Sequence, residues 1–176
     1  MPTPNLSFTV DDDVEVPDPA PGDVWTVGAV ILNRAGEAFA HKRSPDRRLF
    51  PDSWDIVGGH LEAGETILEA LAREIEEETG WRLTHVRRSL GTTTWVGDDG
   101  GRIRREADYL VEVDGDLDNP TLEWSKHSAY DWFGPDNLAR LKENRRPGEF
   151  LIHDLVERAI EDRPQRSPRG TPRPTR

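Results

Sequence analysis

The chain has 176 residues, a formal net charge of −11 at pH 7 and no cysteine. The length suits one domain, the lack of thiols excludes disulfides, thiolate metal sites and cysteine nucleophiles, and the acidic charge argues against a nucleic-acid polymer as partner. No segment is long and apolar enough for a membrane span, and the N-terminus has no basic and apolar leader, so we expect a cytoplasmic protein.

Composition divides the chain into three parts. Residues 1–23 contain six acidic residues and no Lys or Arg, and form an acidic, proline-rich N-terminal segment. Residues 24–161 carry the regular apolar segments and form the predicted folded domain. Residues 162–176 are rich in Pro and Arg and lack apolar side chains, so this tail is predicted to be disordered.

Apolar runs and turn residues predict a strand-rich first half of the domain. Gly28 lies within the first apolar run, and the last strand leads into Gly58 and Gly59. The predicted elements are a buried strand at Val24–Asn33, a hairpin turn at Asn33–Glu37, a strand at Ala38–Arg43, a polar loop at Ser44–Ser53 and a short strand at Trp54–Val57.

The spacing of apolar residues then predicts a helix over Ile67–Thr79. Thr66 with Glu69 three residues later is typical of a capping box at the helix start. Gly80 fits the left-handed position that ends a helix. At about 100° per residue, the side chains of the following residues form one stripe that faces the core: Leu68, Leu71, Ala72, Ile75 and Thr79.

The same helix carries a dense set of glutamates. Glu74 and Glu78 lie about 40° apart around the helix axis, with Glu77 beside them, whereas Glu76 falls on roughly the opposite side. Like charges at these spacings repel one another. A divalent cation compensates for such repulsion, and Mg²⁺ binds a few carboxylates together with substrate phosphates. This helix therefore indicates metal-assisted phosphate chemistry, with Mn²⁺ as a substitute for Mg²⁺.

The second half alternates strands, turns and two further helices. With the first half, this order predicts an α+β fold. The predicted elements are strands at Arg82–Thr94, Ile103–Val113 and Ala129–Phe133, a turn at Gly97–Gly101, a short helix at Pro135–Leu141 and a terminal amphipathic helix at Glu149–Ile160.

The segment Gly59–Trp81 resembles the signature of the Nudix hydrolases. That signature reads Gly, five residues, Glu, seven residues, then Arg-Glu-aliphatic-any-Glu-Glu-any-Gly-aliphatic. Trp81 departs mildly from the last aliphatic position, and the resemblance extends over about Trp25–Leu155. The matching residues here are Gly59, Glu65, Arg73, Glu74, Ile75, Glu77, Glu78 and Gly80.

This resemblance implies a Nudix-type α/β/α sandwich with a mixed sheet between helices. It also implies that the Gly59 carbonyl, Glu74, Glu77 and Glu78 hold the metal. Glu65 is either a dipole partner of the helix or a bridge to Arg73 or a second ion. Arg73 either binds substrate or, as we prefer, holds the acidic cluster together. Weak substrate contacts are expected from Arg43 and His60.

The general base remains open. Some relatives use the position of Glu74, and others use a loop glutamate a few residues before a Trp. That place holds Lys126 here, six residues before Trp132, so Glu74 is favoured. Glu123 and Glu106 are the alternative bases.

Taken together, the residues and the resemblance predict a metal-dependent hydrolase of a small nucleotide-type substrate. It would cleave the pyrophosphate linkage of a nucleoside diphosphate linked to another moiety. Two alternatives are a non-catalytic nucleotide sensor and a diphosphate isomerase, the latter disfavoured because that chemistry uses a cysteine. A homodimer is left open.

Overall fold

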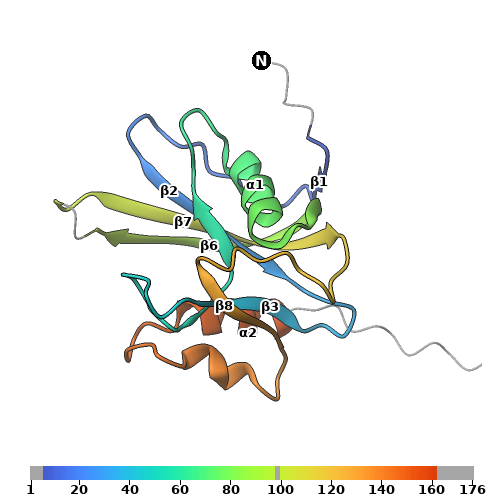
Figure 1. Cartoon of the computed structure of the whole chain (residues 1–176). Helices are drawn as coiled ribbons and strands as arrows, with labels where there is room; N and C mark the ends of the chain where they lie inside the picture. The colour runs from blue at the N-terminus through green and yellow to red at the C-terminus, as the bar shows by residue number, and fades with distance from the viewer. Residues whose placement is uncertain (1–5, 98–99, 162–176) are drawn as a thin grey trace, which may run out of the picture.

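The structure is a computed structural model that describes residues 6–97 and 100–161. Over these residues the chain alternates short and long strands with three helical segments (Figure 1). The elements are β1 (Thr9–Val10), β2 (Val24–Ile31), β3 (Ala38–Arg43), β4 (Trp54–Asp55), β5 (Val57–His60), α1 (Ile67–Thr79), β6 (Arg82–Val96), β7 (Ile103–Asp114), β8 (His127–Phe133), the 3-10 helix η1 (Leu138–Lys142) and α2 (Leu151–Glu161).

The strands form one large mixed sheet and one small antiparallel sheet. The large sheet has the order β1-β6-β7-β2-β5, and the small one has the order β4-β3-β8. At the centre of the large sheet, β2 runs parallel to β7 over eight paired residues and antiparallel to β5. Parallel pairing at the centre of a sheet requires cover on both faces.

The two helices supply that cover. On β2, Val27, Ala29 and Ile31 pack in the hydrophobic core that includes α1. Val30 points the other way, into a second core that includes Leu155 and other residues of α2. Figure 1 shows α1 on one side of the large sheet, and α2 with the small sheet on the other. The predicted α/β/α sandwich with a mixed sheet is confirmed.

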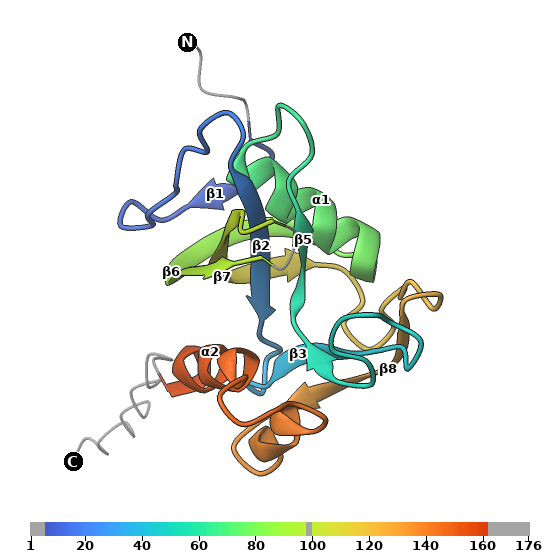
Figure 2. The same cartoon turned by 90° about the vertical axis from the view of Figure 1, so that its left-hand side faces the viewer.

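The strand predicted at Trp54–Val57 is divided between the two sheets. Trp54–Asp55 pairs with β3, whereas the chain from Val57 onward pairs with β2. Between them, the backbone N–H of Ile56 donates to the Asp55 side chain over 2.9 Å, which closes a local turn. This crossing places β5, which contains Gly58 and Gly59, at the edge of the large sheet. Figure 2 shows β5 beside α1.

Two helix predictions differ from the structure in detail. The short helix expected at Pro135–Leu141 is a 3-10 helix that starts later, because the Asn137 side chain accepts from the Gly134 N–H and holds the preceding residues in a turn. The terminal helix covers Leu151–Glu161, close to its predicted bounds. The predicted tail at 162–176 and the centre of the turn at 97–101 lie outside the described residues.

The described part of the N-terminal segment packs against the domain. Strand β1 pairs in parallel with β6 at His85–Val86. Phe8 and Val14 pack against the core under α1, and the Tyr109 hydroxyl donates to the Glu15 carbonyl over 3.1 Å. The division of the chain at residue 24 remains a prediction from composition. In the described ranges, no helix has both the length and the apolar character needed to cross a membrane.

Candidate active site

Helix α1 is fixed at both ends by its own sequence. The Thr66 side chain accepts from the Glu69 N–H, and the Glu69 carboxylate accepts from the Thr66 N–H at 2.9 Å. Gly80 ends the helix in the left-handed region at φ 76°. The apolar stripe is buried against the sheet, and the flank of α1 next to it carries Glu74, Glu77 and Glu78 beside β5.

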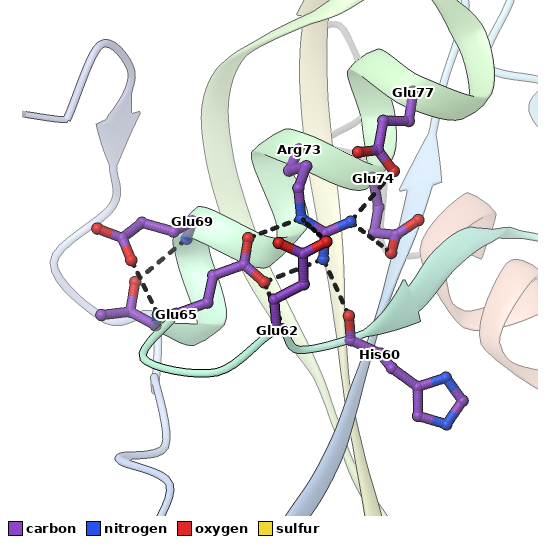
Figure 3. Close-up of polar contacts among 8 residues, drawn as sticks. His60, Glu62, Glu65, Glu69, Arg73, Glu74 and Glu77 are labelled. Carbon is purple, nitrogen blue, oxygen red and sulfur yellow. Dashed lines mark hydrogen bonds and ion pairs between the residues drawn. The ribbon is translucent and has the colours of Figure 1, made fainter.

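Arg73 lies at the centre of the acidic cluster (Figure 3). Its Nε and Nη2 atoms donate to the two carboxylate oxygens of Glu65, at 2.7 and 3.0 Å. Its Nη1 donates to Glu74 at 2.9 Å and to Glu77 at 3.1 Å. Its Nη2 also donates to the backbone carbonyl of His60 at 2.9 Å. One guanidinium thus fixes the loop before α1 and two helical carboxylates relative to each other.

Glu78 is the most buried of the helical carboxylates. Its side chain accepts a 2.9 Å hydrogen bond from the Gly58 N–H, and the residue is only 8% exposed. Burial raises the pKa of Glu78 well above its ordinary value; the Gly58 hydrogen bond opposes this shift, and the charges of Glu74, Asp55 and Glu123 add to it. The site therefore disfavours a bare negative charge here, and a bound cation would offset that penalty.

Glu74 packs directly against the backbone of Gly59. A Cβ atom at position 59 would collide with the Glu74 carboxylate, so any side chain there would displace that carboxylate. Burial raises the pKa of Glu74, while the hydrogen bond and charge of Arg73 lower it. Glu77 is about half exposed, and Glu76 is exposed on another part of the helix surface.

These residues fit a hard divalent cation. Glu74, Glu77, Glu78 and the backbone of Gly59 offer only oxygen ligands, the type that Mg²⁺ and Mn²⁺ prefer. Burial, with the charges of neighbouring carboxylates as a smaller cause, raises the pKa of Glu74 and Glu78. The glycine at position 59 also lets the Glu74 carboxylate approach the backbone closely.

The loop before β8 lies beside the same carboxylates. Lys126 pairs with Glu123 at 2.7 Å. The charge of Lys126 lowers the pKa of Glu74, and that of Glu123 raises the pKa of Glu78. Glu106 belongs to another group, because it accepts from the Thr26 hydroxyl at 3.0 Å and its charge acts on Asp55 and Asp108.

Arg43 and His60, the two residues expected to contact substrate, have different surroundings. Arg43 donates to the Leu49 carbonyl at 2.9 Å and lies 3.4 Å from the Asp55 carboxylate, so its guanidinium is already engaged. His60 contributes its backbone carbonyl to Arg73, while Figure 3 shows its imidazole turned away from the carboxylates. A cavity of about 570 Å³ is lined by His60 and Glu65 together with Asp18 of the N-terminal segment and Trp25 of β2.

A second group of acidic residues was not anticipated from the sequence. Asp108 is fully buried on β7, and burial, followed by the charge of Glu106, raises its pKa to about 9. Burial also raises the pKa of Asp55 to about 6. The sequence did contain a signal for this buried carboxylate, since Asp108 interrupts an apolar run. Gly28 lies opposite it and provides room, because a Cβ there would meet the Asp108 carboxylate.

The contact between two histidines was also not predicted from the sequence. His41 lies on β3 and His127 at the start of β8, and their rings stack with centroids 3.6 Å apart. Burial lowers the pKa of His41 well below its ordinary value and that of His127 to about 4. The sequence separates them by a long stretch, so only strand pairing brings them together.

The sequence and the fold of the chain are similar to those of known proteins. The sequence profile described as the NUDIX domain matches residues 23–153. The nucleoside triphosphatase NudI of Enterobacter sp. is 37% identical over 87 residues, which cover 49% of this chain but only 59% of that protein. NudI of Escherichia coli K12 is 31% identical over 122 residues, which cover 64% of this chain and 84% of its own.

Solved structures agree with these sequence matches. A NUDIX hydrolase from Nitrosomonas europaea has a TM-score of 0.60 at 26% identity, covering 77% of this chain and 86% of its own. A MutT NUDIX hydrolase from Burkholderia pseudomallei has a TM-score of 0.59 at 26% identity, covering 76% and 95%.

Proposed function

The chain belongs to the Nudix hydrolase family, a family of pyrophosphohydrolases, and from this premise we propose that it cleaves the pyrophosphate linkage of a nucleoside diphosphate joined to another group. The proposal includes Mg²⁺, or Mn²⁺ in its place, as the cofactor. The observation that carries it is the cluster of Glu74, Glu77 and Glu78 that Arg73 and the Gly58–Gly59 backbone hold in position.

In this proposal, Glu77 and Glu78 serve as metal ligands together with the Gly59 carbonyl. A cation bound there would neutralise phosphate charge and acidify a water molecule. Other residues of the chain hold these carboxylates in position. Arg73 restrains Glu74 and Glu77 through the hydrogen bonds of one guanidinium, and the Gly58 N–H restrains Glu78. Fixed charges of this kind cost little reorganisation during the reaction.

We assign the general base to Glu74. Its carboxylate is partly buried, its pKa is raised, and it faces the loop that contains Lys126. A base with a raised pKa accepts a proton from water more readily near neutral pH. Glu123 is less suited, because it is paired with Lys126 at 2.7 Å.

Nucleoside triphosphates are the first substrates to test. The sequence relatives are named nucleoside triphosphatases, and a nucleoside triphosphate is a nucleoside diphosphate joined to phosphate. Nucleotide sugars and dinucleotides satisfy the same chemical description. The isomerase alternative lacks support, because the chain contains no cysteine.

A panel assay tests this function. Purified protein with Mg²⁺ is incubated with nucleoside triphosphates, nucleotide sugars and dinucleotides, and the phosphorylated products are separated by ion-exchange chromatography. We expect a nucleoside monophosphate and a second phosphate-bearing product, and we expect EDTA to abolish their formation. Tight nucleotide binding without turnover of any compound would favour the sensor alternative.

A further inference from the structure

Three ligand-type side chains from three elements meet behind the carboxylate cluster. They are His41 of β3, His127 of β8 and Glu78 of α1, which are 1%, 4% and 8% exposed. Each offers one ligand atom, and these atoms all lie within 4.8 Å of one another. His41 Nε2 lies 3.8 Å from Glu78 Oε2.

One nitrogen of each imidazole in this group has no hydrogen-bond partner among the described residues. These nitrogens are the buried Nδ1 atoms of His41 and His127. A buried polar atom without a partner costs about 1–3 kcal/mol. Ring stacking at 3.6 Å accounts for the contact between the imidazoles but gives their nitrogens no partner. A cation held beside Glu78 would partner the imidazole nitrogens that ligate it, which for His41 is Nε2, the atom 3.8 Å from Glu78 Oε2.

We propose that His41, His127 and Glu78 form a second metal site, which takes a borderline transition-metal ion such as Zn²⁺ or Co²⁺. The chemistry of the ligands separates it from the site of the proposed function. Two imidazole nitrogens with one carboxylate suit Zn²⁺, whereas Mg²⁺ favours oxygen ligands. Burial keeps competing water away from the three ligands.

Binding requires one ring to turn. The two imidazole planes are inclined by 18°, and a metal ion lies in the plane of each imidazole that holds it. We assign this turn to His127. It begins β8 directly after the loop that contains Lys126, and the pairing of β3 with β8 shifts register at Arg43, opposite His127.

The two sites share Glu78, so an ion bound at one site affects binding at the other. An ion held by the histidines engages the carboxylate that the Mg²⁺ site also uses. We therefore expect Zn²⁺ and Mg²⁺ to compete, so that Zn²⁺ binding weakens as Mg²⁺ is raised. The existence of the nitrogen site does not depend on turnover, so its failure and that of the proposed hydrolase are separable.

Nuclear magnetic resonance of the imidazole nitrogens tests the site in the unaltered protein. Long-range ¹H–¹⁵N spectra of the full chain are recorded before and after one equivalent of Zn²⁺, and again with Mg²⁺ alone. We expect Zn²⁺ to shift the ring nitrogens of His41 and His127 together, while Mg²⁺ leaves them near their original positions. Shifts confined to other histidines would overturn the proposal.

A pair of variants measures the contribution of His127. Zn²⁺ affinity is measured by calorimetry for His127→Asn and for the matched His153→Asn, whose histidine lies near Asp154 and Glu157 on α2 in a more exposed group. We expect at least a tenfold loss of affinity for His127→Asn and no change for His153→Asn. Equal affinity of His127→Asn and the unaltered protein, or a loss only in His153→Asn, contradicts the site. If His127→Asn does not fold, the spectra of the unaltered protein decide alone.

Discussion

Arg73 holds Glu65 through two hydrogen bonds, from Nε to Oε1 at 2.7 Å and from Nη2 to Oε2 at 3.0 Å, across eight residues of sequence. Hydrogen bonding to Arg73 lowers the pKa of Glu65, and the same contact raises the pKa of Arg73. The pair therefore ties the loop after β5 to the middle of α1. Of the roles considered for Glu65, a bridge to Arg73 is the one that the contacts favour.

Replacement of Arg73 by Lys should show that its role is geometric. Lysine keeps the charge but lacks the planar fork that bonds several carboxylates at once. We expect kcat to fall by about 10–100-fold, as is common when a group that orients metal ligands is removed. Arg82→Lys is the control, because its pair with Asp114 is exposed. Normal kcat in Arg73→Lys would show that charge alone suffices.

Glu78→Gln should separate activity from stability. Burial raises the pKa of Glu78, so the folded protein disfavours its charge at neutral pH, while glutamine still accepts from the Gly58 N–H. We expect the metal-free variant to melt at a higher temperature, and Mg²⁺-dependent kcat to fall about 100-fold or more, equivalent to about 3 kcal/mol.

Two further variants complete this comparison. Glu77→Gln should lose activity to a similar extent, since Glu77 shares Arg73 with Glu74. Glu76→Gln should leave both activity and melting temperature near normal, because Glu76 is exposed away from the cluster. An active Glu78→Gln, or an inactive Glu76→Gln, would contradict the assignment of the helix face.

The sequence predicts α1 to the residue because each signal is local. Thr66 and Glu69 lie within one turn of each other, and Gly80 alone supplies the left-handed end. The residue spacing of the Nudix signature likewise places Glu65, Arg73 and Glu74 within reach of one another along a single loop and helix. Local chemistry therefore defines most of the candidate active site.

Features that depend on strand pairing were not predictable in the same way. Apolar pattern alone does not show that the chain changes sheets at Ile56, because both short strands around it have buried residues. Nor does it show that Thr9–Val10 adds to the sheet edge, since a two-residue strand has no measurable period. The meeting of His41 with His127 depends on the pairing of β3 with β8.

Asp108 should make stability depend on pH. Its folded pKa of about 9 lies above the ordinary 3.8, with burial as the main cause and Glu106 and Asp55 adding to it against the charge of Arg158. Between about pH 4 and 9 the folded protein holds a proton that the unfolded chain releases. The free energy of unfolding should therefore fall as pH rises through this window.

The variant Asp108→Asn isolates that effect. Asparagine is neutral at every pH, so the gap in unfolding free energy between variant and unaltered protein should grow by about 4 kcal/mol over the three pH units from pH 5 to pH 8, given about 1.4 kcal/mol for each unit. Urea unfolding at both pH values measures it. Asp114→Asn, on the exposed end of the same strand, should show no such growth. A constant gap for Asp108→Asn would mean that Asp108 titrates normally.

Glu74, rather than Glu123 or Glu106, should act as the general base. Glu74 lies in the carboxylate cluster with a pKa raised by burial, Glu123 is paired with Lys126, and Glu106 is bonded to Thr26 on the central strand. We expect Glu74→Gln to cost more in kcat than Glu123→Gln or Glu106→Gln.

The pH profile and Mn²⁺ affinity distinguish a base from a ligand. A base must be deprotonated to act, so kcat falls on the acidic side, and glutamine flattens that limb while Mn²⁺ affinity stays largely intact. A ligand loses Mn²⁺ affinity instead. Both quantities are measured for the three variants, with kcat at saturating Mn²⁺. If Glu123→Gln alone abolishes turnover and still binds Mn²⁺ normally, the base comes from the loop before β8, and Lys126 then serves to hold that glutamate close to Glu78.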